Sequence, residues 1–390
     1  MRLLTFTTLY PNAVQPSHGI FVEQRLHKTM AAGRIANTVI APVPWFPSNS
    51  KLFGRYAEFA GVPVRETFNG IEVYHPRYPL IPKVGMTTAP LLLAAAAYAC
   101  AKRLSVVGDT VDLIDAHYFY PDGVAAALIG AWLKIPVVIT ARGTDINLIP
   151  RHSLPRRMIC WAGRRAQALV AVCEALKDEM TRLGLPQDKI KVLRNGVDLQ
   201  VFRPAERETE RRALGLTGPT IVSVGHLIER KGHHLTIAAL AQLPGVELLL
   251  IGEGERRDAL QRLAAQCGVA ERVRFLGRVA QDQLFRYYSA ADVMVLASSR
   301  EGWANVLLES MACGTPVVAS NVWGTPEVVR SSVAGKLLAD RDPASLADAV
   351  RDVLAAPPAR EATRRYAEAF DWNATVSGQL RLFEQVATHA

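Results

Sequence analysis

The sequence predicts an α/β protein of two domains, each built on a parallel β-sheet covered by helices. Three observations predict this class. The chain has 390 residues, which is long for one ordinary domain. Short apolar runs of strand length alternate with helical segments, as in βαβ units. An Asn-Gly turn within residues 194–204 separates two such series. We therefore expect domains at residues 1–200 and 201–371, and a terminal helix at residues 372–390 that packs on either domain.

The strands are expected where β-branched and aliphatic residues cluster. In the first domain these runs are Leu3–Thr8, Thr38–Ala41, Leu113–Ala116, Val137–Thr140, Ala168–Val172 and Lys191–Leu193. In the second domain they are Thr220–Val224, Glu247–Ile251, Val273–Leu276, Val293–Ala297 and Pro316–Ala319. Open parallel sheets bind ligands outside the carboxyl ends of their strands, so we expect the two domains to face each other across a deep cleft that holds the functional site.

Two apolar segments bear on the cellular location. Ala89–Ala101 is the most apolar stretch, but its 13 residues are fewer than the roughly 20 that a membrane span needs. We expect a buried helix there, with an interfacial helix as the alternative. Residues 1–11 lack the apolar centre of a signal peptide and read as a first strand, so we expect a cytoplasmic protein.

Charge and cysteine usage restrict the partners. Residues 1–200 carry 23 Lys and Arg against 14 Asp and Glu, whereas residues 201–390 carry 22 of each, so the whole excess of +9 lies in the first half. Such an excess favours an anionic membrane surface or a phosphorylated substrate. No zinc finger or arginine-rich arm accompanies it, so we expect no nucleic-acid partner. The cysteines are scattered and favour buried thiols over a metal site or disulfides: Cys100, Cys160, Cys173, Cys267 and Cys313.

The segment EGWANVLLESMACGTPVVAS, at residues 301–320, carries two carboxylates around one short helix. Gly302 permits a tight turn after a strand, and a helix is expected at Asn305–Cys313. A helix N-terminus favours a phosphate, and Glu301 and Glu309 could each accept hydrogen bonds from sugar hydroxyls beside it. From spacing alone, a solvated Glu301 and a helix-capping Glu309 are an equally good interpretation.

This segment resembles the signature of retaining glycosyltransferases of family 4, two-domain enzymes of the GT-B fold. The resemblance implies that Glu301 contacts the hexose of a nucleotide diphosphate sugar and that Glu309 contacts its ribose. We place the intervening residues in the donor site as well: Gly302, Trp303, Ala304 and Asn305.

Other segments extend the resemblance over nearly the whole chain. YPNAVQPSHGIFVEQ is similar to the family's first strand-to-helix loop, where Gly19 would let backbone N–H groups approach the diphosphate. DLIDAHYFYPDG is similar to the segment whose histidine lines the reaction centre, which implies roles for His117 and Tyr118. RFLGRV implies that the backbone of Arg278 and Val279 pairs with the nucleobase. LRNGVDLQVFRP resembles the interdomain signature.

Two segments depart from the family pattern. In SVGHLIERKGHHL, Lys231 matches the phosphate-binding lysine, but His226 stands where the family has arginine, and Arg230 is a candidate replacement for the missing charge. In TARGTDIN, Arg142 stands where histidine is common; it either faces an anionic group of the substrate or pairs with Asp145. We assign Arg142 and Asp145 to the acceptor site.

The sequence thus predicts a hexosyltransferase that uses a UDP- or GDP-sugar, retains the anomeric configuration and needs no metal or other cofactor. His117, Lys231 and Glu301 are the candidate catalytic residues, and His117 and Tyr118 also face the acceptor. The expected acceptor is lipid-linked or a growing polysaccharide, as in exopolysaccharide or teichuronic-type glycan synthesis, with the enzyme either free in the cytoplasm or peripheral at the inner face of the membrane. The alternatives are a GT-B epimerase or phosphorylase and a non-catalytic sugar-nucleotide-binding protein. A nicotinamide-dependent dehydrogenase is disfavoured because no Gly-x-Gly-x-x-Gly follows the first strand.

Overall fold

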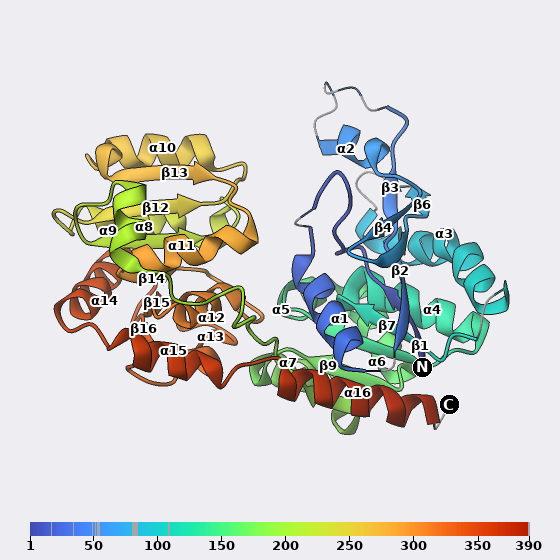
Figure 1. The fold of residues 1–390 in the computed structure, drawn as a ribbon. Coiled ribbons are helices and arrows are strands. Elements are labelled where there is room, and N and C mark those ends of the chain that lie inside the picture. The colour runs from blue at the N-terminus through green and yellow to red at the C-terminus, as the bar shows by residue number, and fades with distance from the viewer. Residues whose placement is uncertain are drawn as a thin grey trace. The chain divides into compact units, whose positions relative to one another are not determined.

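The chain folds into two compact units (Figure 1). The computed structural model describes residues 1–16, 18–33, 35–48, 50, 52, 55–79, 85–107 and 110–388. Unit 1 consists of Met1–Arg194 and Ala374–Ala390, and unit 2 of Asn195–Asn373. The chain therefore passes into unit 2 six residues before the expected boundary at 200/201. The terminal helix forms at Asn373–Thr388 and belongs to unit 1, while residues 389 and 390 lie outside the described residues.

Unit 1 contains an eight-stranded sheet in the order β10-β9-β8-β7-β1-β2-β5-β4 and a two-stranded sheet of β3 and β6. The strands are β1 Arg2–Phe6, β2 Ala36–Ile40, β3 Val43–Trp45, β4 Arg65–Phe68, β5 Ile71–Tyr74, β6 Arg77–Pro79, β7 Leu113–His117, β8 Val137–Ala141, β9 Ala168–Ala171 and β10 Ile190–Val192. All neighbours pair in parallel except β4 and β5. That antiparallel hairpin was not expected; it turns at Asn69 and Gly70, whose φ angles of 47° and 79° suit a type I′ turn.

Helices cover both faces of the large sheet in unit 1 (Figure 1). They are α1 Ile20–Ala32, α2 Arg55–Gly61, α3 Gly85–Val107, α4 Val124–Leu133, α5 Thr144–Asn147, α6 Ser153–Arg165, α7 Glu174–Arg182 and α16 Asn373–Thr388. Leu382 and Phe383 of α16 share a buried cluster with Leu3 and Leu113 of the central strands. On the opposite face, Gly130 of α4 lies so close to Val137 that an added Cβ would come within 2.4 Å of it. Each face is therefore closed by apolar packing.

The apolar segment Ala89–Ala101 forms the middle of α3. One side of this helix is buried through Leu93, Ala94, Ala97 and Ala101, which recur at helical spacing. The other side is exposed: Leu91, for example, retains 53% of its accessible surface. Among the described helices, none combines the length and the apolarity of a membrane span.

Unit 2 contains a six-stranded sheet, all parallel, in the order β13-β12-β11-β14-β15-β16. Its strands are β11 Thr220–Val224, β12 Glu247–Ile251, β13 Val273–Gly277, β14 Val293–Leu296, β15 Val317–Ala319 and β16 Gly335–Leu337. Its helices are α8 Arg207–Leu214, α9 His233–Leu240, α10 Arg257–Gln266, α11 Leu284–Ala290, α12 Asn305–Ala312, α13 Thr325–Val328, α14 Pro343–Ala355 and α15 Arg360–Glu368. The five expected strands are present, and the short edge strand β16 was not expected.

Each sheet has one point where the order of its strands reverses. In unit 1 the chain proceeds from β1 to β2 on one side and later adds β7 on the other side of β1. In unit 2 it proceeds from β11 through β12 to β13 and then adds β14 on the other side of β11. The loops that leave two such neighbouring strands diverge, which opens a crevice at their carboxyl ends. These two points are therefore where a ligand site is expected in each unit.

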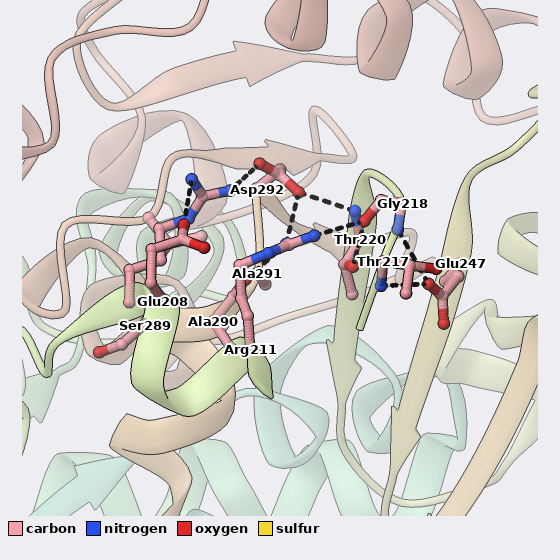
Figure 2. A network of polar contacts seen from close by, with 12 residues as sticks. Glu208, Arg211, Thr217, Gly218, Thr220, Glu247, Ser289, Ala290, Ala291 and Asp292 are labelled. Atoms are coloured by element: carbon pink, nitrogen blue, oxygen red, sulfur yellow. Dashed lines mark hydrogen bonds and ion pairs between the residues drawn. The ribbon is translucent and has the colours of Figure 1, made fainter. Parts of the chain in front are cut away.

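At the opposite end of the unit 2 sheet, a polar network fastens α8 to the starts of the strands (Figure 2). Arg211 of α8 donates to the carbonyl of Gly218 at 2.7 Å, to that of Ala290 at 3.1 Å and to the Asp292 carboxylate at 3.3 Å. Asp292 also accepts a hydrogen bond from Thr220 N at 2.8 Å and contacts Arg207. One carboxylate thus joins a helix, the start of β11 and the start of β14.

Replacing Asp292 by alanine is expected to lower the free energy of unfolding of unit 2 by about 1–3 kcal/mol. The substitution leaves the backbone N–H of Thr220 without its acceptor in a partly buried setting and removes one of the three acceptors of Arg211. Urea denaturation measures the loss. Asp340→Ala, at an exposed position, serves as the control and should change stability by less than about 0.5 kcal/mol. Equal stability of the two variants would contradict this role of Asp292.

Candidate active site

Glycines bring two loops of unit 2 together at the reversal point between β11 and β14. Gly232 ends the turn Glu229–Lys231 with a φ of 74°, and an added Cβ would lie 1.9 Å from the carbonyl oxygen of Ala297. Only glycine fits this approach. The loops are also joined by a hydrogen bond of 2.9 Å from Ser299 N to Arg230 O. As a result, the basic residues before Gly232 lie beside the acidic residue that follows β14.

Glu301 is held by two cations in this loop pair. Its Oε1 lies 2.7 Å from Lys231 Nζ and 3.5 Å from an Arg230 guanidinium nitrogen. Arg230 also donates to the carbonyl of Arg300 at 2.8 Å. Burial disfavours the charged form of Glu301, which is only 7% exposed, but Lys231 and then Arg230 outweigh that effect and hold its pKa below the usual value. Glu301 is therefore an ionised, fixed hydrogen-bond acceptor and not a solvated surface residue.

Further positive charge gathers around His226, which is exposed at the start of the same loop. Partial desolvation lowers the pKa of His226, and the nearby charges of Lys231, Arg230 and Arg278 lower it further. His226 is therefore neutral at pH 7 and does not replace the charge of an arginine. Arg278 is exposed and Val279 is half-buried, just after Gly277, whose φ is 68°. Three permanent cations in this region can attract an anionic ligand.

The second carboxylate, Glu309, lies on α12 and is 8% exposed. The buried hydroxyl of Tyr288 donates to its Oε2 at 3.1 Å. Burial raises the pKa of Glu309 to about 7, although hydrogen bonds from Tyr288 and Gln281 oppose the rise. A helix-capping role is excluded, because Glu309 is the fifth of the eight residues of α12 and its side chain bonds to α11 instead of to the backbone N–H groups at the helix start.

The residues between the two carboxylates have different environments. Trp303 is 8% exposed and donates from Nε1 to the carbonyl of Asn195 at 2.9 Å. Its ring also packs against Phe370 at a centroid distance of 6.3 Å. The Trp303 side chain thus fastens the start of unit 2, and its expected place in the donor site stays a prediction. Gly302 is half-buried, and Ala304 precedes α12, where the N–H of Asn305 donates to Trp303 O at 3.2 Å and that of Leu307 donates to Ala304 O at 3.1 Å.

Asn305 begins α12 and is half-buried. Its side-chain oxygen lies 3.3 Å from the Asn195 amide nitrogen. Asn305 therefore links the helix start to the same segment that Trp303 holds.

In unit 1, Gly19 allows the loop after β1 to fold back on itself. It precedes α1 with a φ of 65°, and an added Cβ would lie 2.2 Å from the carbonyl oxygen of Leu9. The end of β1 is further fixed by Asp122, whose buried carboxylate accepts hydrogen bonds from Thr8 N at 3.1 Å and Thr8 Oγ1 at 3.0 Å. The carboxyl ends of β1 and β7 are thereby held together at the reversal point of this sheet.

His117 ends β7 at this point and is 1% exposed. Its Nε2 lies 2.9 Å from Asp115 Oδ2, and its Nδ1 lies 2.6 Å from an Arg142 guanidinium nitrogen. A guanidinium only donates, so Nδ1 accepts and the Nε2–H donates to Asp115. Burial lowers the pKa of His117 more than Asp115 raises it. The imidazole is therefore neutral at pH 7 in a fixed tautomer.

Arg142 is held between His117 and the ring of Phe21, whose centroid is 5.3 Å from its guanidinium carbon. Burial lowers its pKa to about 9, and Arg25 contributes to the decrease. Arg142 remains charged at pH 7. The expected alternative of a side-chain pair with Asp145 is wrong in this structure, because Asp145 instead accepts from the backbone N–H groups of Arg142, Gly143 and Phe119 at 2.6–3.1 Å.

The remaining residues assigned to the acceptor differ in accessibility. Asp145 is fully buried, and its carboxylate accepts from three backbone groups, so it shapes the loop after β8; its expected contact with the acceptor stays a prediction. Tyr118 is half-buried with a φ of 79°. This left-handed backbone is costly for a tyrosine and is typical of functional turns.

Sequence reasoning missed three residues that complete these sites. Asp115 lies two residues before His117, so both side chains project from the same face of β7. A carboxylate within an otherwise apolar strand was the feature of the sequence that could have identified Asp115. Arg25 of α1 is 1% exposed and bonds to Gln379 of α16 at 2.8 Å. Tyr288, the partner of Glu309, gave no signal, because a tyrosine on an apolar helix face is read as core.

No group of three or more histidine, cysteine, aspartate or glutamate side chains suited to a metal occurs in the described part of the chain. Asp340 and Asp342 have the Asp-x-Asp spacing found in some metal sites. Asp342 instead caps α14, where its carboxylate accepts from Ala344 N at 2.8 Å and Ser345 N at 2.9 Å. All five cysteines are free thiols.

Comparison with known proteins adds to this geometry. The family model described as Glycosyltransferase Family 4 matches residues 30–201, and the model described as Glycosyl transferases group 1 matches residues 206–370. D-inositol 3-phosphate glycosyltransferase of Mycolicibacterium smegmatis is 36% identical over 292 residues, which are 70% of this chain and 67% of that protein. The putative teichuronic acid biosynthesis glycosyltransferase TuaC of Bacillus subtilis is 29% identical over 90% of this chain and 88% of its own.

A solved structure shows the same fold. Alr3699/HepE of Anabaena, crystallised with UDP-glucose, superposes with a TM-score of 0.73 at 21% identity and covers 99% of both chains. Two Rossmann-like units with parallel sheets are thus arranged along the chain as in that protein.

Proposed function

The chain belongs to glycosyltransferase family 4 and has the GT-B fold, and from this premise we propose that it transfers a hexose from a nucleotide diphosphate sugar to an acceptor hydroxyl with retention of the anomeric configuration. The observation that carries the proposal is the loop pair of unit 2, where buried Glu301 is ionised and fixed between Lys231 and Arg230. Such a group can accept hydrogen bonds from hexose hydroxyls while the neighbouring cations face phosphates.

Unit 2 is proposed to bind the donor. Lys231 and Arg230, with the start of α12, would neutralise the diphosphate as negative charge builds up on the leaving group. Glu309 would accept a hydrogen bond from the ribose, and the backbone at Arg278 and Val279 would pair with the base. His226 is neutral, so Arg230 is the better replacement for the arginine of the family pattern. With these cations in place, transfer would need no metal, and activity should be unchanged by a chelator.

Unit 1 is proposed to bind the acceptor and to contribute Gly19 to the diphosphate site. The neutral His117, fixed by Asp115 and Arg142, presents a ring of defined tautomer at the end of β7. Tyr118 and the positive charge of Arg142 would orient the acceptor. Since no carboxylate nucleophile is assigned, the leaving phosphate would accept the proton of the attacking hydroxyl on the same face of the sugar. The protein would contribute positioning and charge stabilisation.

The acceptor is proposed to be a lipid-linked or growing polysaccharide, with the enzyme in the cytoplasm or peripheral at the inner face of the membrane. The similarity to the putative teichuronic acid biosynthesis enzyme over 90% of this chain supports a polymeric acceptor. The basic excess of residues 1–200 supports an anionic one. A UDP-sugar donor is supported by the UDP-glucose complex of the Anabaena protein, and a GDP-sugar is the alternative.

A panel of UDP-, GDP-, ADP- and dTDP-sugars in a thermal-shift assay tests the donor. A ligand at 100 times its Kd stabilises the protein by about 2.7 kcal/mol, so one nucleotide class should raise Tm clearly above the others. Product analysis by NMR then distinguishes the candidates: transfer with retention supports the proposal, while epimerisation, phosphorolysis or tight binding without turnover would each replace it. The absence of any responder would contradict a donor site in unit 2.

A further inference from the structure

Three neighbouring helices of unit 1 contain no acidic residues. α4 contacts both α3 and α6, and α3 contacts α6 (Figure 1). The sequences of α3, α4 and α6 contain no Asp or Glu, although unit 1 has acids elsewhere. α6 carries four exposed arginines: Arg156, Arg157, Arg164 and Arg165. This charge is a large part of the excess in residues 1–200.

Large apolar side chains are exposed on the same helices. The exposed fractions are 49% for Met86, 53% for Leu91, 48% for Trp132 and 42% for Leu154. On α3, Leu91, Ala95 and Ala99 are exposed at intervals of four residues and form a stripe opposite the buried side of the helix. On α6, Leu154, Arg157 and Arg164 recur at helical spacing, so apolar and basic side chains share one face. We call this exposed surface of α3, α6 and the end of α4 the α3–α6 face.

The end of α4 adds an aromatic residue beside a lysine. The Trp132 ring packs edge-on against Tyr98 of α3 at a centroid distance of 5.5 Å, and Lys102 Nζ lies 6.0 Å from the centre of the Tyr98 ring. Amphipathic rings next to lysine are enriched where proteins meet the headgroup layer of a membrane. A half-exposed tryptophan in this setting can insert its ring among lipids while the lysine contacts phosphates.

We propose that the α3–α6 face binds the surface of an anionic lipid bilayer. Basic side chains without acidic neighbours on the same helices are attracted to anionic headgroups, and exposed aliphatic chains gain by insertion below them. Nucleic acid would use the charge but would leave Met86, Leu91 and Leu154 in water, so it fits the surface less well. This inference rests on the proposed function only in that a lipid-linked acceptor would lie in the same membrane; lipid binding requires neither donor nor transfer.

The face also reaches the end of unit 1 that carries His117. The hydroxyl of Tyr120, three residues after His117, donates to the carbonyl of Met86 at the start of α3 and lies 3.9 Å from the sulfur of Met158 in α6. The first turn of α3 and the second turn of α6 are thus adjacent to the segment that follows β7. An acceptor held in the bilayer would be presented at the candidate site and not at the far edge of the sheet.

Flotation of the full-length protein with vesicles tests the proposal. Vesicles of phosphatidylcholine are compared with vesicles containing phosphatidylglycerol, at about 20 mM and about 500 mM salt, because screening weakens exposed charges. We expect binding only to the anionic vesicles and mainly at low salt. Arg157→Glu/Arg164→Glu should lower the vesicle affinity by more than about 30-fold, since each basic residue near an anionic surface contributes about fivefold. Leu91→Ser should lower it several-fold at both salt concentrations.

The matched control is Arg262→Glu/Arg365→Glu, which makes the same change in net charge at exposed positions of unit 2. It should bind vesicles like the wild type. Circular dichroism and the donor-induced Tm shift should be unchanged in all variants, which separates a failure of lipid binding from a failure of the proposed function. Equal binding to neutral vesicles, equal loss in both double variants, or no binding at low salt would overturn the proposal. If Leu91→Ser has no effect on vesicle binding, and the wild type binds a short RNA duplex that Arg157→Glu/Arg164→Glu does not bind, the face is a nucleic-acid surface.

Discussion

Lys231→Met is expected to lower kcat for glycosyl transfer by about 10²–10³-fold, the cost of removing one donor that stabilises developing charge in an active site. Lys231 Nζ lies 2.7 Å from Glu301, and methionine preserves the length of the apolar stem while removing the charge. In the proposed reaction this ammonium group faces the leaving diphosphate, where negative charge is greatest in the transition state. The donor KM should change much less than kcat.

Steady-state kinetics with the donor found in the nucleotide panel measures this effect. Lys336→Met, at an exposed lysine of unit 2, is the control and should have wild-type kcat. Lys231 also holds down the pKa of Glu301, so the variant should show a new loss of activity toward low pH as Glu301 becomes easier to protonate. Wild-type turnover of Lys231→Met would remove Lys231 from the mechanism.

Glu309→Gln is expected to stabilise unit 2 at pH 8 while weakening donor binding. Burial raises the pKa of Glu309 to about 7 from its ordinary value of 4.5. Between these values the folded state holds a proton that the unfolded state has released, so stability decreases as pH rises from about 4.5 to about 7 and stays lower above that. The neutral glutamine escapes this penalty. The gain should be about 1–3 kcal/mol at pH 8 and close to zero at pH 4, below both pKa values.

The same substitution removes a charged acceptor for the ribose, so the Kd of the donor should rise by about 10- to 100-fold at pH 8. In the wild type, donor affinity should increase from pH 6 to pH 8 as Glu309 ionises, and the variant should lose this dependence. Urea denaturation and calorimetric titration provide the two measurements. Glu271→Gln, at an exposed position, should change neither. A variant that is less stable at pH 8, or that binds the donor normally, would contradict the assignment.

Much of the fold was predictable because most of its strands are continuous apolar runs in the sequence. β11 and β12 match their expected bounds, since a parallel strand covered on both faces is a continuous apolar run with polar ends. β3 and β16 did not stand out because their sequences, VPW and GKL, interrupt the apolar pattern with proline or with glycine and lysine. The β4–β5 hairpin could have been found, because Asn69-Gly70 between alternating residues is a strong turn signal. The GT-B fold expected from the resemblance is confirmed.

The site was less predictable, because burial depends on contacts between distant segments. The loop pair that joins Lys231 to Glu301 brings together residues 70 positions apart. Trp303 and Asp145 lie within matching motifs, yet their polar atoms bond to the backbone of Asn195 and of Phe119, which no local pattern reveals. The ligand roles of Glu301, Glu309 and His117 stay predictions until a donor is identified.

The assignment of α16 to unit 1 has a consequence for biosynthesis. Leu382, Phe383 and Val386 are synthesised after unit 2, yet they belong to the buried cluster around Leu3 and Leu113. All residues of unit 2 have been synthesised once the growing chain reaches Asn373. Part of one face of the unit 1 sheet therefore stays uncovered until unit 2 has been translated. Chaperones that shield apolar surface would be needed most during that interval.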